Sequence, residues 1–380
     1  MSDSQPNQPL SITLPPLRIT VNQQNSQQQV NLEWLAQNKD AIANAQPQIP
    51  DNWKRWISLN KLFNKSEQSM IETMQNNGVD PAIARIAINQ VATESSFAIG
   101  NNIAQLLRKL ESTLAIQQQL ATLSSKTTTI ERRSGVSQQE FIDRYYATNT
   151  PVILTDLMHD WPAMKTWSPE YFKQKYGHVD VEIQANRNSN PEYEIQCEKH
   201  KQTIRLSDYV DRILTGGKNN DYYMVANNQN LERDELKGLL DEIIFFPEFL
   251  NGDDRSNKVF FWFGPAGTIT PLHHDPVNLM MAQIYGRKRW RVFSPQQTPL
   301  LYNHVGVFSK VDCENPDYQK YPLFKNTTPI EVILEPGEVI FMPVGWWHQV
   351  KALDPSISLS FTNFVFPNCY NWQDPQIHSW

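Results

Sequence analysis

The stretch Thr268-Ile-Thr-Pro-Leu-His-His-Asp-Pro276 decides how this chain of 380 residues folds around its most reactive side chains. His273 and Asp275 are two residues apart, and side chains at positions i and i+2 of an extended strand point to the same face. An imidazole and a carboxylate therefore converge there, whereas His274 points the other way. The stretch predicts a β-strand that presents two metal ligands on one face.

A second imidazole lies far downstream, in Gly345-Trp-Trp-His-Gln349. Two histidines and one carboxylate cover one face of an octahedral metal ion and leave three adjacent positions open, which is the ligand set of non-haem Fe(II) oxygenases. Zinc hydrolases can share these ligand types, and a lone His-x-Asp can also be a hydrogen-bonded surface pair. We predict that His273, Asp275 and His348 bind one metal ion and form the catalytic centre.

The next strands add a buried cation. After the apolar run Leu279–Tyr285, Gly286 predicts a hairpin turn into Arg287-Lys-Arg-Trp-Arg-Val-Phe293. Alternation places Lys288 on the same face as Trp290 and the three arginines on the opposite, solvated face. A buried lysine needs an anionic partner, and no acidic residue is near it in sequence. A bound carboxylate ligand would supply that partner.

Four motifs, in this order, resemble those of the JmjC (cupin-like) 2-oxoglutarate oxygenases. They are Thr-Pro-Leu-His-His-Asp (270–275), Gln-Ile-Tyr-Gly-Arg-Lys-Arg-Trp (283–290), Glu-Pro-Gly-Glu-Val-Ile-Phe-Met-Pro (335–343) and Gly-Trp-Trp-His (345–348). The resemblance extends over residues 134–366 and is greatest to the asparaginyl-hydroxylase branch typified by factor inhibiting HIF. It implies a mainly β fold, a double-stranded β-helix (jelly roll) preceded by helices, with Fe(II) and 2-oxoglutarate as cofactors.

The resemblance also assigns residues to 2-oxoglutarate. Lys288 corresponds to the lysine that binds the distal carboxylate, and Thr270 and Tyr223 correspond to its hydroxyl donors; charge-assisted hydrogen bonds of this kind are strong. Strict alternation places Thr270 opposite His273, so a bulge at the intervening proline is needed to bring them together. Tyr223 adjoins Tyr222, and packing in a strand is the alternative explanation for a tyrosine there.

A further assignment concerns the other end of the cofactor. Asn363 falls where the asparaginyl hydroxylases place an asparagine near the 1-carboxylate; a buried asparagine bonded to the backbone is the alternative. Two positions depart from that branch: Leu279 replaces a second asparagine, with Asn278 one position off and facing away, and Val365 replaces an aromatic residue that covers substrate. Cofactor binding survives these departures, but substrate identity does not transfer.

Composition bounds the partners and the compartment. The net charge of −6, from 34 basic and 40 acidic residues, provides no global basic field and disfavours nucleic acid as a partner. The sequence shows neither a signal peptide nor an apolar run of membrane length. Three scattered cysteines are most simply free thiols in a reducing compartment. We therefore expect a soluble cytoplasmic protein without a membrane partner.

The chain divides into four predicted parts: a flexible tail rich in Gln, Asn, Ser and Pro (1–30), an N-terminal helical module (31–125), a linker (126–133) and the catalytic domain (134–380). In the module, helices are expected at Glu67–Asn76 after the N-cap Ser66, from Pro81 after Asp80, and at Asn102–Leu123. The long C-terminal helical pair through which the asparaginyl-hydroxylase branch dimerises is not expected, since the sequence ends at Trp380. The N-terminal helices are the candidates for a homodimer interface or a docking site, or they pack onto the catalytic domain.

In the catalytic domain, short segments between Gly, Pro and Asn turns indicate a sandwich or barrel. Helices are predicted at Ser137–Thr148, from Pro169 and, as an insertion, at Glu232–Glu242. Strands are predicted at Pro151–Leu154, Val179–Ile183, Tyr193–Cys197, Tyr222–Ala226 and Val259–Phe263.

The resemblance implies an Fe(II)- and 2-oxoglutarate-dependent dioxygenase that hydroxylates a C–H of a protein or peptide side chain, with release of succinate and CO2. Alternatives are hydroxylation of a modified tRNA base, for which Arg287, Arg289 and Arg291 form the one basic cluster, hydroxylation of a small metabolite, and a non-oxidative metal-binding cupin. Lys288 and Thr270 argue against the last. The sequence does not decide between hydroxylation and demethylation.

Overall fold

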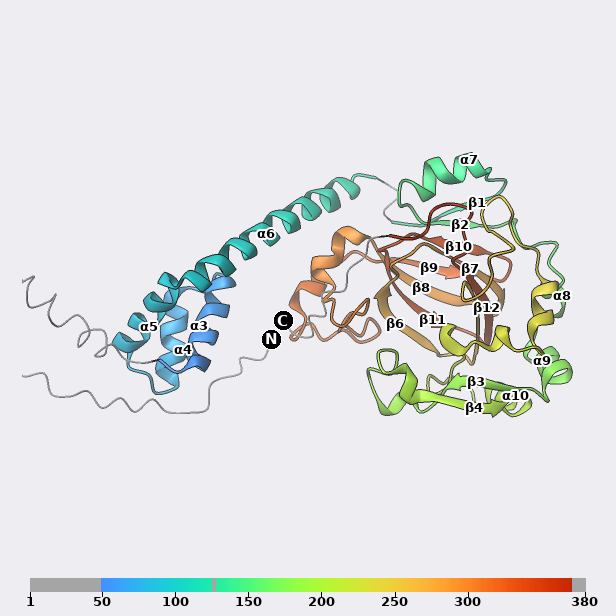
Figure 1. Ribbon diagram of the computed structural model, residues 1–380, viewed down its shortest axis with the longest axis horizontal. Coiled ribbons are helices and arrows are strands. Elements are labelled where there is room, and N and C mark those ends of the chain that lie inside the picture. Colours follow the sequence, from blue (N-terminus) through green and yellow to red (C-terminus); the bar gives the residue numbers. More distant parts are fainter. Residues whose placement is uncertain (1–48, 125–127, 371–380) are drawn as a thin grey trace, which may run out of the picture. The chain divides into compact units, whose positions relative to one another are not determined.

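The structure is a computed structural model that describes residues 49–124 and 128–370 (Figure 1). The chain forms two compact units, 1–113 and 114–380, so the division falls inside the helix α6 (Ser95–Ala121) and not at the predicted linker. The predicted tail, residues 1–30, lies outside the described residues, as do residues 31–48 of the predicted module. Of the predicted linker, Glu131–Arg133 form the strand β1 and belong to the catalytic unit.

The N-terminal unit is built by α3 (Asp51–Leu62), α4 (Glu67–Asn76) and α5 (Pro81–Thr93), whose buried faces share one apolar core. The predicted helix starts are confirmed: the Ser66 hydroxyl accepts from the amide of Ser69, and the Asp80 carboxylate accepts from the first amides of α5. The third helix begins at Ser95 and not at Asn102. Across the two described stretches of chain, no helix has the length and apolar character needed to span a bilayer.

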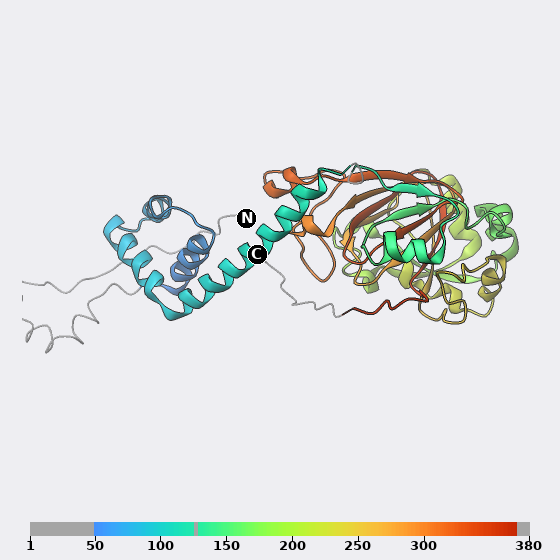
Figure 2. The same cartoon turned by 90° about the horizontal axis from the view of Figure 1, so that it is seen from above.

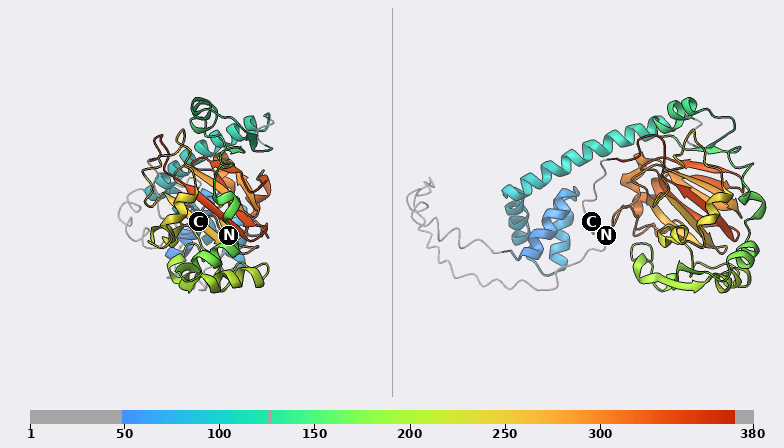
Figure 3. Two further views of the ribbon diagram at one scale, coloured as in Figure 1. Left: turned by 90° about the vertical axis from the view of Figure 1, so that its right-hand side faces the viewer. Right: turned by 45° about the vertical axis from the view of Figure 1, so that its right-hand side comes forward.

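The core of the catalytic unit consists of two mainly antiparallel sheets, as a jelly roll requires (Figures 1 and 3). The larger sheet has the strand order β1-β2-β10-β7-β12-β5, and the smaller has the order β6-β11-β8-β9. The strands not yet given are β2 (Val152–Leu154), β5 (Val259–Gly264), β6 (Ile269–His274), β7 (Leu279–Tyr285), β8 (Lys288–Phe293), β9 (Ile330–Leu334), β10 (Val339–Met342), β11 (Trp347–Ala352) and β12 (Ser356–Phe361).

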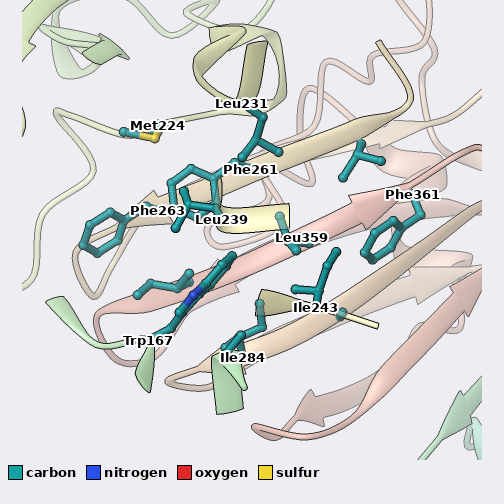
Figure 4. Close-up of a cluster of buried hydrophobic side chains, with 14 of the residues drawn as sticks. Trp167, Met224, Leu231, Leu239, Ile243, Phe261, Phe263, Ile284, Leu359 and Phe361 are labelled. Carbon is teal, nitrogen blue, oxygen red and sulfur yellow. The ribbon is translucent and has the colours of Figure 1, made fainter. Parts of the chain in front are cut away.

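Alternation along these strands creates two apolar layers. The layer between the sheets takes side chains from both, such as Met281 and Ile340 from the larger and Trp290 and Val332 from the smaller. The opposite side chains of β5, β7 and β12 form the outer layer, which Figure 4 shows in part. This layer packs under α9 (Pro169–Tyr176) and α10 (Leu206–Thr215). The predicted jelly roll is therefore confirmed.

Several local predictions were wrong. The segment Tyr193–Cys197 is not a strand, because the partner of β3 (Asp180–Gln184) is β4 (Lys201–Arg205). Tyr222–Ala226 makes only single bridges, one to β3 and one to β5.

Helix lengths also differ from the prediction. The helix expected at Ser137–Thr148 is α7 (Gln138–Phe141) followed by one π-helical turn, η2 (Ile142–Tyr146). The insertion expected at Glu232–Glu242 is helical only as 3-10 turns, of which η7 covers Lys237–Glu242. Cys197, Cys313 and Cys369 are free thiols, as predicted.

Candidate metal and cofactor site

The three predicted metal ligands meet at one end of the smaller sheet. β6 carries His273 near its end, Asp275 follows directly, and His348 lies opposite His273 in the β6–β11 register. Their ligand atoms all lie within 4.8 Å of one another. Asp275 oxygens are 3.9 Å from Nε2 of His273 and 3.5 Å from Nε2 of His348. Two ligands that each bind an ion at about 2.1 Å are separated by distances of this order.

Backbone carbonyls orient both imidazoles. Nδ1 of His273 lies 2.8 Å from the carbonyl oxygen of Pro271, and Nδ1 of His348 lies 3.1 Å from that of Trp346. A carbonyl oxygen only accepts, so each Nδ1 carries the hydrogen and each Nε2 presents its lone pair to the shared centre. Hydrogen bonds of this kind set the tautomer of metal-binding histidines.

His348 is held neutral as well as oriented. Its ring is buried and stacks on Trp290, with ring centroids 5.4 Å apart. Burial, and then the neighbouring imidazole of His273, lower the pKa of His348 to about 3. His274 packs against Trp347 on the other side of the strand, as alternation predicts. His348 can therefore bind a metal ion without first losing a proton.

Beside the triad, a cavity of about 550 Å3 opens between the two sheets. The larger sheet contributes Trp262, Met281 and Ser360 to its wall, and the smaller contributes the metal-ligand end and Lys288. The complete lining is Glu194, Tyr223, Val225, Ala226, Asn257, Phe260, Trp262, Thr270, His273, Asp275, Pro276, Val277, Leu279, Met281, Lys288, Trp290, Val307, Phe308, His348, Val350, Ser360 and Thr362.

Lys288 brings a cation into this cavity. The side chain is 1% exposed, and Nζ donates one hydrogen bond, 3.2 Å long, to the hydroxyl of Tyr223. Within the described part of the chain, Lys288 forms no ion pair with a carboxylate, and burial alone lowers its pKa to about 7. An ammonium with three donors and one neutral partner fits an incoming carboxylate.

Tyr223, and not Tyr222, faces the cavity. The Tyr222 hydroxyl instead donates to the carbonyl of Arg212, on the other side of the segment. Burial raises the pKa of Tyr223 well above its usual value, so its hydroxyl stays protonated and can donate to a ligand. The structure thus decides between the two adjacent tyrosines.

Thr270 reaches the cavity through the predicted bulge. In the β6–β11 pairing, His273 lies opposite His348 and Thr270 lies opposite Val350. Between these two pairs, β6 therefore contains one residue more than β11. The extra residue on β6 reverses the alternation, so Thr270 and His273 line the same cavity.

Asn363 does not line the cavity. Its Nδ2 donates to the carbonyl of Asn251 at 2.7 Å, and its own carbonyl accepts from the Asn251 amide. Asn363 lies past the end of β12 and fixes a neighbouring loop, so its position lends no support to the predicted contact with the cofactor. The neighbouring Thr362 and, within β12, Ser360 face the cavity instead.

The departures from the asparaginyl-hydroxylase pattern lie where alternation places them. Leu279 lines the cavity, whereas Asn278 turns away and accepts from the Val344 amide at 2.8 Å. Val365 is exposed and lies outside the lining.

Of the three arginines predicted to form a solvated face, Arg287 is exposed, whereas Arg289 and Arg291 are largely shielded. Arg287 pairs with Asp354, Arg289 with Glu314 and Arg291 with Glu331. The Arg289 and Arg291 side chains are 23% and 20% exposed, because acidic residues from neighbouring segments cover them. Paired arginines leave little free positive charge for a nucleic acid backbone.

Sequence reasoning missed a buried arginine behind the cavity. Arg187 is fully buried; it donates to Glu194 at 2.7 Å and to the carbonyl of Ile269, next to Thr270, at 2.8 Å. Its guanidinium lies 5.3 Å from the centre of the Tyr223 ring. Arg187 therefore contacts the backbone next to one predicted hydroxyl donor, Thr270, and lies over the ring of the other, Tyr223. No local signal identifies it, since Asn186-Arg-Asn-Ser reads as a polar loop.

The residues present fit the expected cofactors. The triad offers two neutral imidazoles and one carboxylate with matched orientation, which suits a divalent metal such as Fe(II). Lys288, Tyr223 and Thr270 gather on the cavity wall and would hold the distal carboxylate of 2-oxoglutarate.

The pKa of Lys288 predicts a pH-dependent affinity for 2-oxoglutarate. Because this pKa is about 7 in the cofactor-free protein, the ammonium is lost as the pH rises above 7, and binding of a carboxylate then requires uptake of a proton. We expect the dissociation constant to rise by about tenfold per pH unit above 7. Isothermal titration with Mn(II)-loaded protein, in buffers of different ionisation enthalpy, measures both the affinity and the proton taken up. An affinity that stays constant from neutral to alkaline pH contradicts the assignment.

Comparisons with known proteins agree with this geometry. Residues 137–364 match the family described as Cupin-like domain. Lysine-specific demethylase 8 of Xenopus tropicalis is 34% identical over 242 residues, which are 62% of this chain and 52% of that protein. Lysine-specific demethylase JMJ30 of Arabidopsis thaliana is 31% identical over 267 residues, 69% of this chain and 60% of that protein.

A third relative, HSPB1-associated protein 1 of Homo sapiens, is 28% identical over 233 residues, 57% of this chain and 47% of that protein. The chain thus spans about half to three fifths of the length of these relatives. The family match extends over more than half of the chain and includes every predicted ligand. The chain belongs to the cupin-like family, and its triad and cavity fit the Fe(II) and 2-oxoglutarate that the JmjC resemblance implies.

Proposed function

We propose that this protein hydroxylates a C–H bond of a protein or peptide side chain, with His273, Asp275 and His348 as the iron ligands. The observation that carries the proposal is that one cavity contains both this triad and the buried Lys288, which has no carboxylate partner in the described part of the chain. A hydrolase or binding cupin with a similar triad has no need of a buried cation. A 2-oxoglutarate oxygenase needs both groups.

The chain's own residues orient and insulate the reaction. When bound, Fe(II) and 2-oxoglutarate supply the oxidising chemistry: the cofactor and dioxygen are converted to succinate and CO2, and one oxygen atom enters the substrate C–H. Lys288 and Tyr223 fix the distal end of the cofactor, and Thr270 supplies a further hydroxyl. Trp290 and Met281 form an apolar wall that limits access of water.

A peptide substrate is supported by a second hollow beside the cavity. This hollow, of about 260 Å3, shares Ala226, Asn257 and Phe260 with the cavity lining. Asn228 and Asn230 in its lining are buried and bonded to the backbone of this chain, so they shape the wall of the hollow. A substrate residue in the cavity would therefore continue with its neighbours into a hollow whose shape is fixed. The paired arginines of β8 favour this substrate class over nucleic acid.

Demethylation is the second candidate, because two of the similar proteins carry the name lysine-specific demethylase. The same oxidation applied to an N-methyl group gives an unstable carbinolamine that releases formaldehyde. The two outcomes therefore share one site and differ only in which C–H bond lies near the iron.

Peptide turnover separates these candidates. Protein loaded with Fe(II) under anaerobic conditions would be offered 2-oxoglutarate, dioxygen and matched peptides with and without N-methylated lysine. Hydroxylation adds one oxygen atom to the peptide, whereas demethylation removes a methyl group and produces formaldehyde. Mass spectrometry of the peptide, with succinate measured in parallel, distinguishes them. If the protein forms no succinate from 2-oxoglutarate, neither with a peptide nor in the uncoupled reaction without one, the proposed function is overturned.

A further inference from the structure

The helix α6 (Ser95–Ala121) carries apolar side chains that nothing covers in the described part of the chain. It has 27 residues, which corresponds to a length of about 40 Å, and none of its residues is buried. Seven of its Leu and Ile residues have exposed fractions between 46% and 64%. They are Ile99, Ile103, Leu106, Leu107, Leu110, Ile116 and Leu120. Figure 2 shows α6 as one uninterrupted helix.

These seven residues follow a single heptad register. With Ile103 at position a, the exposed residues fall at positions a, d, e and g, and none falls at b, c or f. Ile99, Ile103, Leu106 and Leu110 are spaced four, three and four residues apart, which is the a/d spacing of a coiled coil. Leu107 and Ile116, at positions e and g, widen this a/d seam on either side.

The opposite edge of α6 serves its own unit. Within the N-terminal unit, the partly shielded residues of α6 at positions b and f are Phe97, Asn101, Ala104 and Arg108, and Phe97 packs against the core formed by α3, α4 and α5. The a/d edge therefore faces away from the contact that α6 makes with this core. A long helix gains most of its stability from packing an apolar face, so this edge requires a partner.

We propose that this partner is α6 of a second copy of the chain, and that the protein forms a homodimer through a two-stranded coiled coil. A two-fold interface places the same surface of both copies in contact, so that surface must be complementary to itself. The α6 edge meets this condition because its a and d positions carry no charge. Lys109 is the only charged residue at an e or g position, and its counterpart at e in a parallel pair is Leu114. Self-pairing thus creates no contact between like charges.

The exposed area suits a reversible dimer. A half-exposed Leu or Ile leaves on the order of 60 Å2 of apolar surface in water, so seven leave roughly 400 Å2 per copy. Two copies remove about 800 Å2, and the stems of flanking polar side chains bring the total to roughly 1,000 Å2, the lower limit for specific interfaces. We therefore expect dissociation in the micromolar range.

The test is sedimentation velocity of the full chain over micromolar concentrations. We expect the mass to rise from that of a 44.0 kDa monomer to twice this value as the concentration rises. Leu106→Glu with Leu110→Glu places charges at d and a, and should leave the protein monomeric. The control variant, Gln105→Glu with Ser112→Glu, adds the same charge at exposed c positions and should dimerise as the natural chain does.

Circular dichroism and succinate formation verify that both variants remain folded and active, and they keep this test separate from the proposed function. A natural chain that stays monomeric over this concentration range overturns the proposal. A Leu106→Glu, Leu110→Glu variant that still dimerises overturns it too, because the interface then lies elsewhere.

Discussion

Replacing His273 by alanine is expected to abolish succinate formation while the chain stays folded. The substitution removes one of three ligands whose atoms lie within 4.8 Å of one another, and the remaining two do not define a facial set. Loss of groups that merely orient metal ligands costs 10- to 100-fold in metal affinity or activity, so loss of a ligand should cost more than about 100-fold. Metal titration and succinate formation, with circular dichroism for the fold, measure the effect.

The chain offers a matched control one residue away. His274 lies on the same strand but packs against Trp347, outside the cavity. His274→Ala should lower stability somewhat and leave metal affinity within a few fold of the natural protein. If the two alanine variants lose metal binding equally, or if His273→Ala stays active, the assignment of the triad fails.

Replacing Lys288 by methionine is expected to have two effects of opposite sign. Loss of the charge-assisted bond to the distal carboxylate costs about 1.5–3 kcal/mol, which is roughly a 10- to 150-fold rise in the KM for 2-oxoglutarate. The same change removes a buried cation that has one neutral partner, Tyr223, so the cofactor-free protein should become more stable. Affinity for the metal should be unchanged.

Steady-state kinetics and thermal unfolding of the cofactor-free protein measure these effects. Arg289→Met is the matched control, because it removes a cation from the next position of β8 that pairs with Glu314 on the other face. The control should leave the KM for 2-oxoglutarate unaltered. An unchanged KM in Lys288→Met would mean that the carboxylate binds elsewhere, and a loss of stability would mean that the ammonium has a structural partner.

The local sequence pattern was sufficient to predict which way a side chain points where this depends only on alternation along one strand. His273 and Asp275 share a face because they are two residues apart on one strand, and Lys288 shares a face with Trp290 for the same reason. Gly286 has φ +68°, as a tight turn between β7 and β8 requires. These features follow from the backbone geometry of a few neighbouring residues.

Tertiary structure decided what depends on segments far apart in the chain. Thr270 reaches the cavity only because β6 gains a residue relative to β11, and Tyr223 was distinguished from Tyr222 only by the bridges that its segment makes to β3 and β5. Asn363 lies outside the cavity lining because the chain turns after β12 toward Asn251.

Contacts between distant segments also determine how buried Arg187 and the arginines of β8 are. Arg187 is buried because Glu194 and the β6 backbone meet around it, while Arg289 is shielded by Glu314 from a distant loop. The sequence alone determined the family, the fold class and the metal triad, since these depend on short motifs and strand periodicity. Register shifts and long-range ion pairs decided the rest of the cofactor site, because their energies depend on contacts between residues that the sequence separates.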